Sequence, residues 1–336
     1  MAALTFAARA GMLRRSYVPH PSSFLHPLLA LRTAFMLHAS AVYSRVGALA
    51  FASVLDAMPL AAQERLVERR TFAEGQGKLI GYYSAALTFS PAEAPLVERA
   101  GTVRAAVEVS YIPALSEDRR RVGDKPEASN LAPVIPRPRA SLALPGAVRL
   151  EASWIPPVKL FGVKANVVSA ALSRTFGGAA GALSLTPRVA GTIGRVEGAI
   201  TCYEDLSAGD AALREYFDFV CHGRESEDHF SPRHVTGEMI VARTPPASAR
   251  GLGALTPYAG AGVRLDRTRF DIGVITDNGA RDADQPILDL HATRPYLFAG
   301  ASWLAARRLR TGAELFYAPG SLVTVRLSGS IRVRGG

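Results

Sequence analysis

Uninterrupted apolar runs of about 18 or more residues are missing beyond residue 65, so a helical membrane span is not expected in the body of the chain. Runs of more than three basic residues are missing as well. The formal charge of +10 comes mostly from arginines, most of which stand singly among apolar residues. Nucleic-acid-binding proteins usually gather such charge on one face or along one helix, so the pattern disfavours that class of partner.

Cysteine is scarce, with only Cys202 and Cys221 in 336 residues. Two cysteines are too few for a zinc cluster, and the histidines from His222 to His234 lack the HExxH spacing of a zinc site. The DNGARDADQPILD stretch, Asp277 to Asp289, does not keep the glycine and glutamate register of a calcium loop. No phosphate-binding glycine loop or Gly-x-Ser-x-Gly motif occurs. We therefore predict no metal site, no cofactor and no catalytic residue.

Glycine and proline, in contrast, are abundant, at 30 and 22 residues, and accompany frequent Val, Thr, Tyr and Ala. This composition favours many short strands and turns over helices. A secretory-signal pattern precedes them: Arg45, an apolar core from Val46 to Leu55, and small residues at Ala61 and Ala62. We predict that residues 1–62 hold an over-extended N-terminus plus a signal peptide, with the true start at Met36. An internal helix over 46–62 is the alternative.

Export changes the interpretation of the two cysteines. In an oxidising compartment, two cysteines separated by 18 residues pair more often than they stay free. We therefore expect a disulfide between Cys202 and Cys221 that closes an acidic, extramembrane loop.

Beyond the signal, segments of about ten residues alternate apolar with polar or small residues, as strands of a membrane barrel do. Gly101 to Tyr111, Ala147 to Ile155 and Phe161 to Val167 are the clearest. The apolar parity predicts that Val107, Leu150 and Val163 face lipid. The charged residues predicted to face the lumen are Arg104, Glu108, Arg149, Glu151, Lys164, Arg188, Arg195 and Glu197. Because they mix both signs, they fit either a narrow, packed lumen or a water-filled pore.

Aromatic residues recur at strand ends. They are either part of the aromatic girdles that membrane barrels carry at the two lipid–water interfaces, or ordinary core residues. They are Tyr111, Trp154, Tyr258, Tyr296, Trp303 and Tyr317.

The fold predicted from this pattern is a closed, all-β, antiparallel transmembrane barrel of roughly 12 strands, within a range of 10 to 14. The barrel is expected to span residues 78–336, after a short N-terminal segment at 63–77. Long connections are expected near 114–137, 202–233 and 277–288, and the second of these is the long polar loop.

The signal, the alternating strands and the PYAGAG segment, Pro257 to Gly262, make residues from about 75 to 336 resemble bacterial outer-membrane β-barrel proteins. The resemblance is to the general class and implies no specific functional family. It implies residence in the bacterial outer membrane, contact with its lipid, and insertion by the barrel assembly machinery. Members often end in an aromatic residue, whereas this chain ends in Arg-Val-Arg-Gly-Gly.

Three functional hypotheses follow. The first is a structural, adhesive or narrow-pore barrel that admits at most small solutes. The second is a barrel-embedded enzyme acting on lipid, for which Ser173, Ser184 and Ser302 are the candidate nucleophiles. The third is a soluble exported β-sandwich that binds a partner, since soluble sheets also alternate apolar and polar residues.

Overall fold

A computed structural model describes residues 65–115, 121–122, 125–127, 133–179, 182–209, 211–245, 254–306 and 308–335. The predicted signal segment, with Met36 and Ala62, lies outside the described residues. Within the described part of the chain, no helix is both long enough and apolar enough to cross a membrane.

The described chain is mainly strand. Ten strands form a ring: β2 (Val103–Tyr111), β5 (Val134–Leu144), β6 (Val148–Ile155), β8 (Val163–Arg174), β10 (Leu183–Gly198), β12 (Arg233–Arg243), β13 (Leu255–Asp271), β14 (Ile287–Leu304), β15 (Leu309–Ala318) and β16 (Leu322–Arg334). Four short strands pair with the ring from outside it: β1 (Val67–Arg70), β7 (Lys159–Leu160), β9 (Phe176–Gly177) and β11 (Asp228–Ser231). A separate two-stranded sheet joins β3 (Arg121–Val122) to β4 (Lys125–Pro126). The helices are α2 (Gly75–Ala86) and α4 (Ala211–Phe219), with 3-10 turns at Pro145–Ala147 and Glu204–Leu206.

Each ring strand pairs antiparallel with both of its neighbours, and the ring closes where β16 pairs with β2 and β13 with β14. Closure gives every ring strand a partner on both sides, which matters for a sheet that meets lipid. The predicted closed antiparallel barrel is therefore confirmed. The ring has 10 strands, the lower bound of the expected range.

The outward face of the ring is apolar. Every ring strand contributes at least one large hydrophobic side chain that is exposed, such as Val107 on β2, Leu150 on β6 and Leu327 on β16. Exposed apolar surface this extensive is not tolerated in water but suits contact with hydrocarbon chains. The protein is thus built as a membrane barrel.

The predicted girdle aromatics divide between the two faces. Tyr111, Trp154, Trp303 and Tyr317 point outward and are exposed. Tyr258 and Tyr296 are buried inside the ring, where their hydroxyl groups donate to carboxylates. Only the four outward aromatics are therefore available to a membrane interface.

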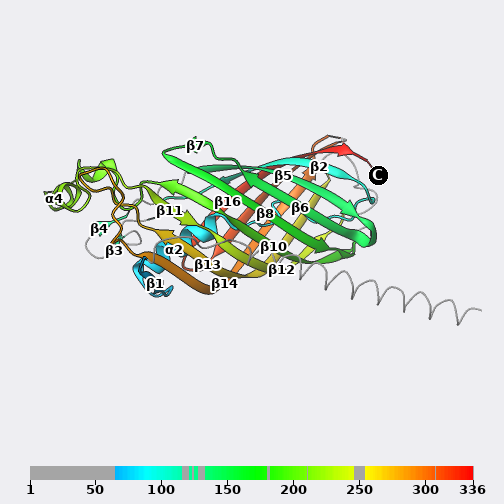
Figure 1. Cartoon of the computed structure of the whole chain (residues 1–336). Coiled ribbons are helices and arrows are strands. Elements are labelled where there is room, and N and C mark those ends of the chain that lie inside the picture. Colours follow the sequence, from blue (N-terminus) through cyan, green and yellow to red (C-terminus); the bar gives the residue numbers. More distant parts are fainter. Residues whose placement is uncertain are drawn as a thin grey trace, which may run out of the picture. The chain divides into compact units, whose positions relative to one another are not determined.

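The two ends of the ring differ. β2, β10 and β13 all finish at one end, so the strand ends that lead into the expected long connections near 114–137, 202–233 and 277–288 all lie there. We call this the loop end; α4, β3 and β4 lie at it (Figure 1). The opposite end, which we call the turn end, carries the short turn at Pro145–Ala147 and the start of β2, and β16 finishes there. The final strand pairs with β2 through an irregularity between Arg332 and Arg334.

The interior of the ring is filled by the chain that precedes β2. We call residues Gly75 to Glu98, which comprise α2 and an extended stretch, the lumen segment. At the loop end the Tyr82 hydroxyl donates to the Pro113 carbonyl oxygen at 2.7 Å, and at the turn end Arg149 donates to the Leu96 carbonyl oxygen at 3.1 Å. The barrel wall therefore begins at Val103 and not at residue 78.

The sequence of the lumen segment explains its burial. No charged residue occurs from Leu79 to Ala92, and α2 is buried on every side from Leu79 to Ala86. A helix that is apolar all round needs a surrounding core, which the inner face of the barrel supplies. Pro91 cannot continue a helix, and the segment runs on in extended form.

Candidate functional site: the occupied lumen

Backbone carbonyl groups of the lumen segment are bound by arginines of the wall. The extended stretch after α2 has no helix or sheet partner for these groups, and a buried carbonyl without a partner is costly. Four arginines on three ring strands fill this need: Arg137 donates to Leu87 at 3.1 Å and to Thr88 at 3.3 Å, Arg139 to Ser90 at 3.0 Å, Arg188 to Phe89 at 2.8 Å, and Arg326 to Thr88 at 2.9 Å. The middle of the segment is thereby anchored from several sides of the ring.

A fifth arginine, Arg264 on β13, extends this contact. Its Nη1 donates to the Thr88 hydroxyl at 3.0 Å, and its Nη2 donates to the Gly81 carbonyl oxygen at 3.4 Å. Arg264 therefore links α2 to the extended stretch that follows.

The ring of Phe89 lies among three of these guanidinium groups. The centroid is 4.3 Å from the guanidinium carbon of Arg139, 4.8 Å from that of Arg188 and 5.8 Å from that of Arg137. Phe89 is only 1% exposed, and it packs with Ala171 and Ala190 of the wall. Desolvated cation–π contacts of this kind stabilise the docked segment beyond simple apolar burial.

Buried carboxylates neutralise the arginines. Arg188 lies between Glu151 at 2.9 Å and Glu238 at 2.8 Å. Arg139 pairs with Glu108 at 2.6 Å. The remaining close pair is Arg264 with Asp266, at 2.8 Å. Because each group is withdrawn from water, removal of one partner leaves an uncompensated buried charge.

Glu314 on β15 holds the part of the segment that follows Phe89. Its carboxylate accepts hydrogen bonds from the Ser90 hydroxyl, from the Ala92 amide at 3.1 Å and from the Tyr258 hydroxyl at 3.0 Å. Ser302 accepts from the Ala94 amide at 2.7 Å. The amide groups of the extended stretch are thus bound as well as its carbonyl groups.

An ion-pair cluster closes the network at the turn end. Glu98, the last residue of the lumen segment, contacts Arg104 at 2.7 Å and Arg149 at 3.0 Å. Polar contacts therefore follow the segment from α2 to the start of β2. An N-terminal segment held in this way occupies the space that an open pore would need.

A serine, a histidine and an aspartate lie together in the lumen, as a lipid-hydrolysing enzyme would need. Their arrangement, however, is not that of a catalytic triad. Ser84 on α2 donates directly to Asp266, and its Oγ lies 3.3 Å from His234 Nδ1. In a hydrolytic triad the histidine stands between the serine and the acid. All three side chains are buried, Ser84 on the lumen segment and His234 and Asp266 on the wall that faces it. The predicted nucleophiles Ser184 and Ser302 make structural hydrogen bonds instead.

Five of the predicted lumen residues point inward and belong to the network around the lumen segment. They are Arg104, Glu108, Arg149, Glu151 and Arg188. Their mixed charges serve a packed lumen, the first of the two interpretations drawn from the sequence.

Lys164, Arg195 and Glu197 point outward instead, against the prediction. Their side chains are 51%, 53% and 38% exposed, and Glu197 contacts Lys164 at 3.5 Å and Arg195 at 3.1 Å. Val163, predicted to face lipid, lies on the inward side and packs against the core around α2. Near the loop end α2 makes the lumen apolar, and the outward face carries exposed charge, so the usual parity of a barrel strand is inverted there.

Several residues of the network were not predicted from the sequence, because they lie on strands to which no lumen face was assigned. They are Arg137, Arg139, Glu238, Arg264, Asp266, Glu314 and Arg326. The alternation of Val263 and Leu265, both exposed, with Arg264 and Asp266 was a usable signal for two of them.

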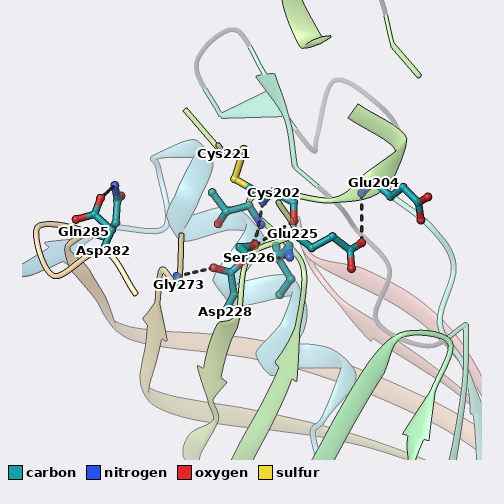
Figure 2. The surroundings of a disulfide bond; sticks show 11 residues. Cys202, Glu204, Cys221, Glu225, Ser226, Asp228, Gly273, Asp282 and Gln285 are labelled. Atoms are coloured by element: carbon teal, nitrogen blue, oxygen red, sulfur yellow. Dashed lines mark hydrogen bonds between the residues drawn. A yellow bond between two sulfur atoms is a disulfide. The ribbon is translucent and has the colours of Figure 1, made fainter. Parts of the chain in front are cut away.

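A lobe at the loop end contains the predicted disulfide, which joins Cys202 to Cys221 (Figure 2). Asp228 lies buried beneath it and accepts hydrogen bonds from the amides of Ile200 at 2.9 Å, Thr201 at 2.6 Å and Gly273 at 2.8 Å. These contacts tie the lobe to the loop that follows β13. We call residues 199–232 the disulfide lobe. In the described ranges, no group of three or more His, Cys, Asp or Glu residues is placed to hold a metal ion.

Comparisons with known proteins yield fold likeness only. No family model and no curated protein matches the chain. Among solved structures, a designed transmembrane β-barrel matches at 13% identity and a TM-score of 0.25, covering 71% of this chain and 100% of that one. The KdgM porin matches at 7% identity and a TM-score of 0.29, covering 69% of this chain and 99% of that one. Omp33, an outer-membrane protein of Acinetobacter baumannii, matches at 7% identity and a TM-score of 0.26, covering 69% of this chain and 98% of that one.

Proposed function

We propose that the protein is an integral barrel of the bacterial outer membrane whose own N-terminal segment keeps its lumen closed. Its role is then structural or adhesive, performed by the wall and the loops rather than by an open channel. One observation carries this proposal: wall arginines bind the consecutive carbonyl groups from Leu87 to Ser90 inside the ring.

The outward face supports the membrane part of the proposal. An apolar belt with outward aromatics suits outer-membrane lipid as a partner, and closed barrels of this kind are inserted by the barrel assembly machinery. The disulfide lobe supports an exported location, because disulfides persist in oxidising compartments.

A narrow pore is the second candidate function. The wall residues that bind the lumen segment are charged and hydrogen-bonding, and they would line a water-filled path if the segment withdrew. Small solutes would then be the cargo.

Cell fractionation tests the location. We expect the protein in the outer-membrane fraction, resistant to carbonate extraction, with a gel mobility that shifts when the sample is heated. A soluble periplasmic marker serves as the control. Recovery with that marker, without a heat-dependent shift, would favour the soluble β-sandwich and overturn the proposal.

A further inference from the structure

The lumen segment crosses the barrel in a definite direction. Near its start, Leu79 and Ile80 lie in the core with Phe270 and Leu288, which belong to the loop-end parts of β13 and β14. At its finish, Gly101 donates to the Ala143 carbonyl oxygen at the turn end. The chain before α2 is therefore at the loop end, although the first ring strand starts at the turn end.

β1 extends the sheet at the loop end without being one of the ring strands. It pairs parallel with β14 over the register Val67 to Ile287 through Arg70 to Leu290. β15 first pairs with β14 at Leu297, so this part of β14 would otherwise present an open edge. The Ile287 amide also donates to the Leu66 carbonyl oxygen at 2.9 Å. β1 thus covers an edge that the shorter β15 leaves unpaired.

Arg65 fastens the chain ahead of β1 to the loops. Its Nη1 contacts Asp271 Oδ1 at 2.5 Å, and its Nη2 donates to the carbonyl oxygens of Ile272 at 3.1 Å and Gln285 at 2.8 Å. Both ends of the loop after β13 are therefore joined to the N-terminal segment.

A tight reversal separates β1 from the lumen. The Glu74 carboxylate accepts from the Thr71 amide at 3.0 Å and from the Thr71 hydroxyl at 2.8 Å. The guanidinium carbon of Arg294 lies 3.5 Å from the centroid of the Phe72 ring. The chain thus turns at the mouth of the barrel and enters it as α2.

We propose that the lumen segment is a transmembrane tether that displays β1 on the outer surface of the cell, at the loop end of the barrel. This inference rests on the proposed outer-membrane function, because outer-membrane barrels place long loops outside and short turns in the periplasm. A barrel whose chain only began at β2 would leave its N-terminus in the periplasm. Here the chain crosses the membrane once through the lumen before the first wall strand begins.

Cysteine labelling of intact cells with a membrane-impermeant maleimide tests the display. The native thiols are bonded to each other and do not react. Single variants place a reporter on β1 (Arg69→Cys, with Val67→Cys as a second site), on a loop (Ala283→Cys) and in a turn (Pro145→Cys); all four positions are exposed. Labelling of each folded variant in detergent measures how reachable its thiol is, and each signal from cells is divided by that value.

We expect Arg69→Cys and Val67→Cys to be labelled on cells as fully as Ala283→Cys, and Pro145→Cys to be labelled at less than about a tenth of that level. Labelling of Ala283→Cys without either β1 variant would overturn the tether while leaving the outer-membrane orientation intact. Labelling of Pro145→Cys without Ala283→Cys would overturn the proposed orientation itself, and the display with it.

Discussion

Arg188 of the wall donates to the carbonyl oxygen of Phe89 at 2.8 Å, and its guanidinium carbon lies 4.8 Å from the centroid of the same residue's ring. One side chain therefore binds both the backbone and the aromatic face of one lumen residue. Because Glu151 and Glu238 neutralise the same guanidinium, the contact is part of a compensated, buried network. The stability of the wall and the docking of the lumen segment should consequently be coupled.

The coupling predicts different effects for two substitutions on β10. Arg188→Gln leaves Glu238 buried without its cation and leaves Glu151 with only Arg139, at 3.6 Å, which we expect to lower the free energy of unfolding by about 3 to 5 kcal/mol. Arg195→Gln removes an exposed, outward arginine of the same strand and should cost less than about 1 kcal/mol. Urea unfolding in lipid, followed by tryptophan fluorescence, measures both. Equal, small effects at the two sites would contradict the buried network.

The outward belt predicts that tolerance of charge depends on depth. Val107 on β2 and Val158 in the loop after β6 are 50% and 56% exposed. In a protein surrounded only by water, an arginine at either position would therefore cost about the same. Arg at a lipid-facing midplane position costs roughly 2 to 4 kcal/mol, whereas Arg in a loop stays hydrated. We expect Val107→Arg to reduce folding yield in lipid vesicles and Val158→Arg to leave it unchanged. Equal yields would mean that Val107 does not face lipid.

The disulfide should act locally. Closing a loop between residues 19 apart contributes on the order of 3 kcal/mol to the lobe. The ring, however, has its own ladder of hydrogen bonds, so the lobe can open without the barrel. In the double variant Cys202→Ser and Cys221→Ser, protease should cleave faster between Tyr203 and Val220, and the heat-dependent gel shift should remain. Loss of that shift would show that the lobe holds the barrel together.

His229 on β11, outside the ring, should titrate below the ordinary histidine value. Partial burial lowers its pKa, and the nearby Arg195 guanidinium lowers it further. The folded state therefore favours the neutral ring; this contribution to stability is present above about 6.5, the unfolded pKa, and is lost as pH falls from there through the lower folded-state pKa. We expect an NMR titration midpoint below that value, and a higher midpoint in Arg195→Gln. An unchanged midpoint in that variant would rule out the charge effect.

The sequence predicted correctly which side chains of the wall face lipid and which face the lumen, wherever the lipid face is apolar and the lumen face is polar. On β2, Val107 and Val109 are exposed outward while Arg104 and Glu108 are buried inward, as alternation implies. On β8 the rule failed, because α2 makes the inward side at Val163 apolar while Lys164 is exposed on the outer face. Apolar parity therefore identifies the lipid face only where the lumen is polar.

The lumen segment was not predicted, and alternation could not reveal it. Its helix is too short to resemble a membrane span, and its extended part has no partner strand whose pattern it must match. The absence of charge from Leu79 to Ala92 was the available signal, since a helix that is apolar all round belongs inside a core. The core that encloses this helix exists only because the ring closes. Closure depends on the pairing of β2 with β16, which are far apart in the sequence.

The central claim is that the N-terminal segment closes the lumen, and ion conductance in a planar lipid bilayer tests it most directly. Phe89→Ala removes a ring that is 1% exposed and held by three guanidinium groups, which should weaken docking of the segment by about 3 to 5 kcal/mol. Phe219→Ala, at the last residue of α4, which is 75% exposed, is the matched control.

We expect the native protein and Phe219→Ala to insert without steady conductance, and Phe89→Ala to show frequent channel openings. Steady, ohmic conductance of the native protein at the level of Phe89→Ala would contradict the closed lumen.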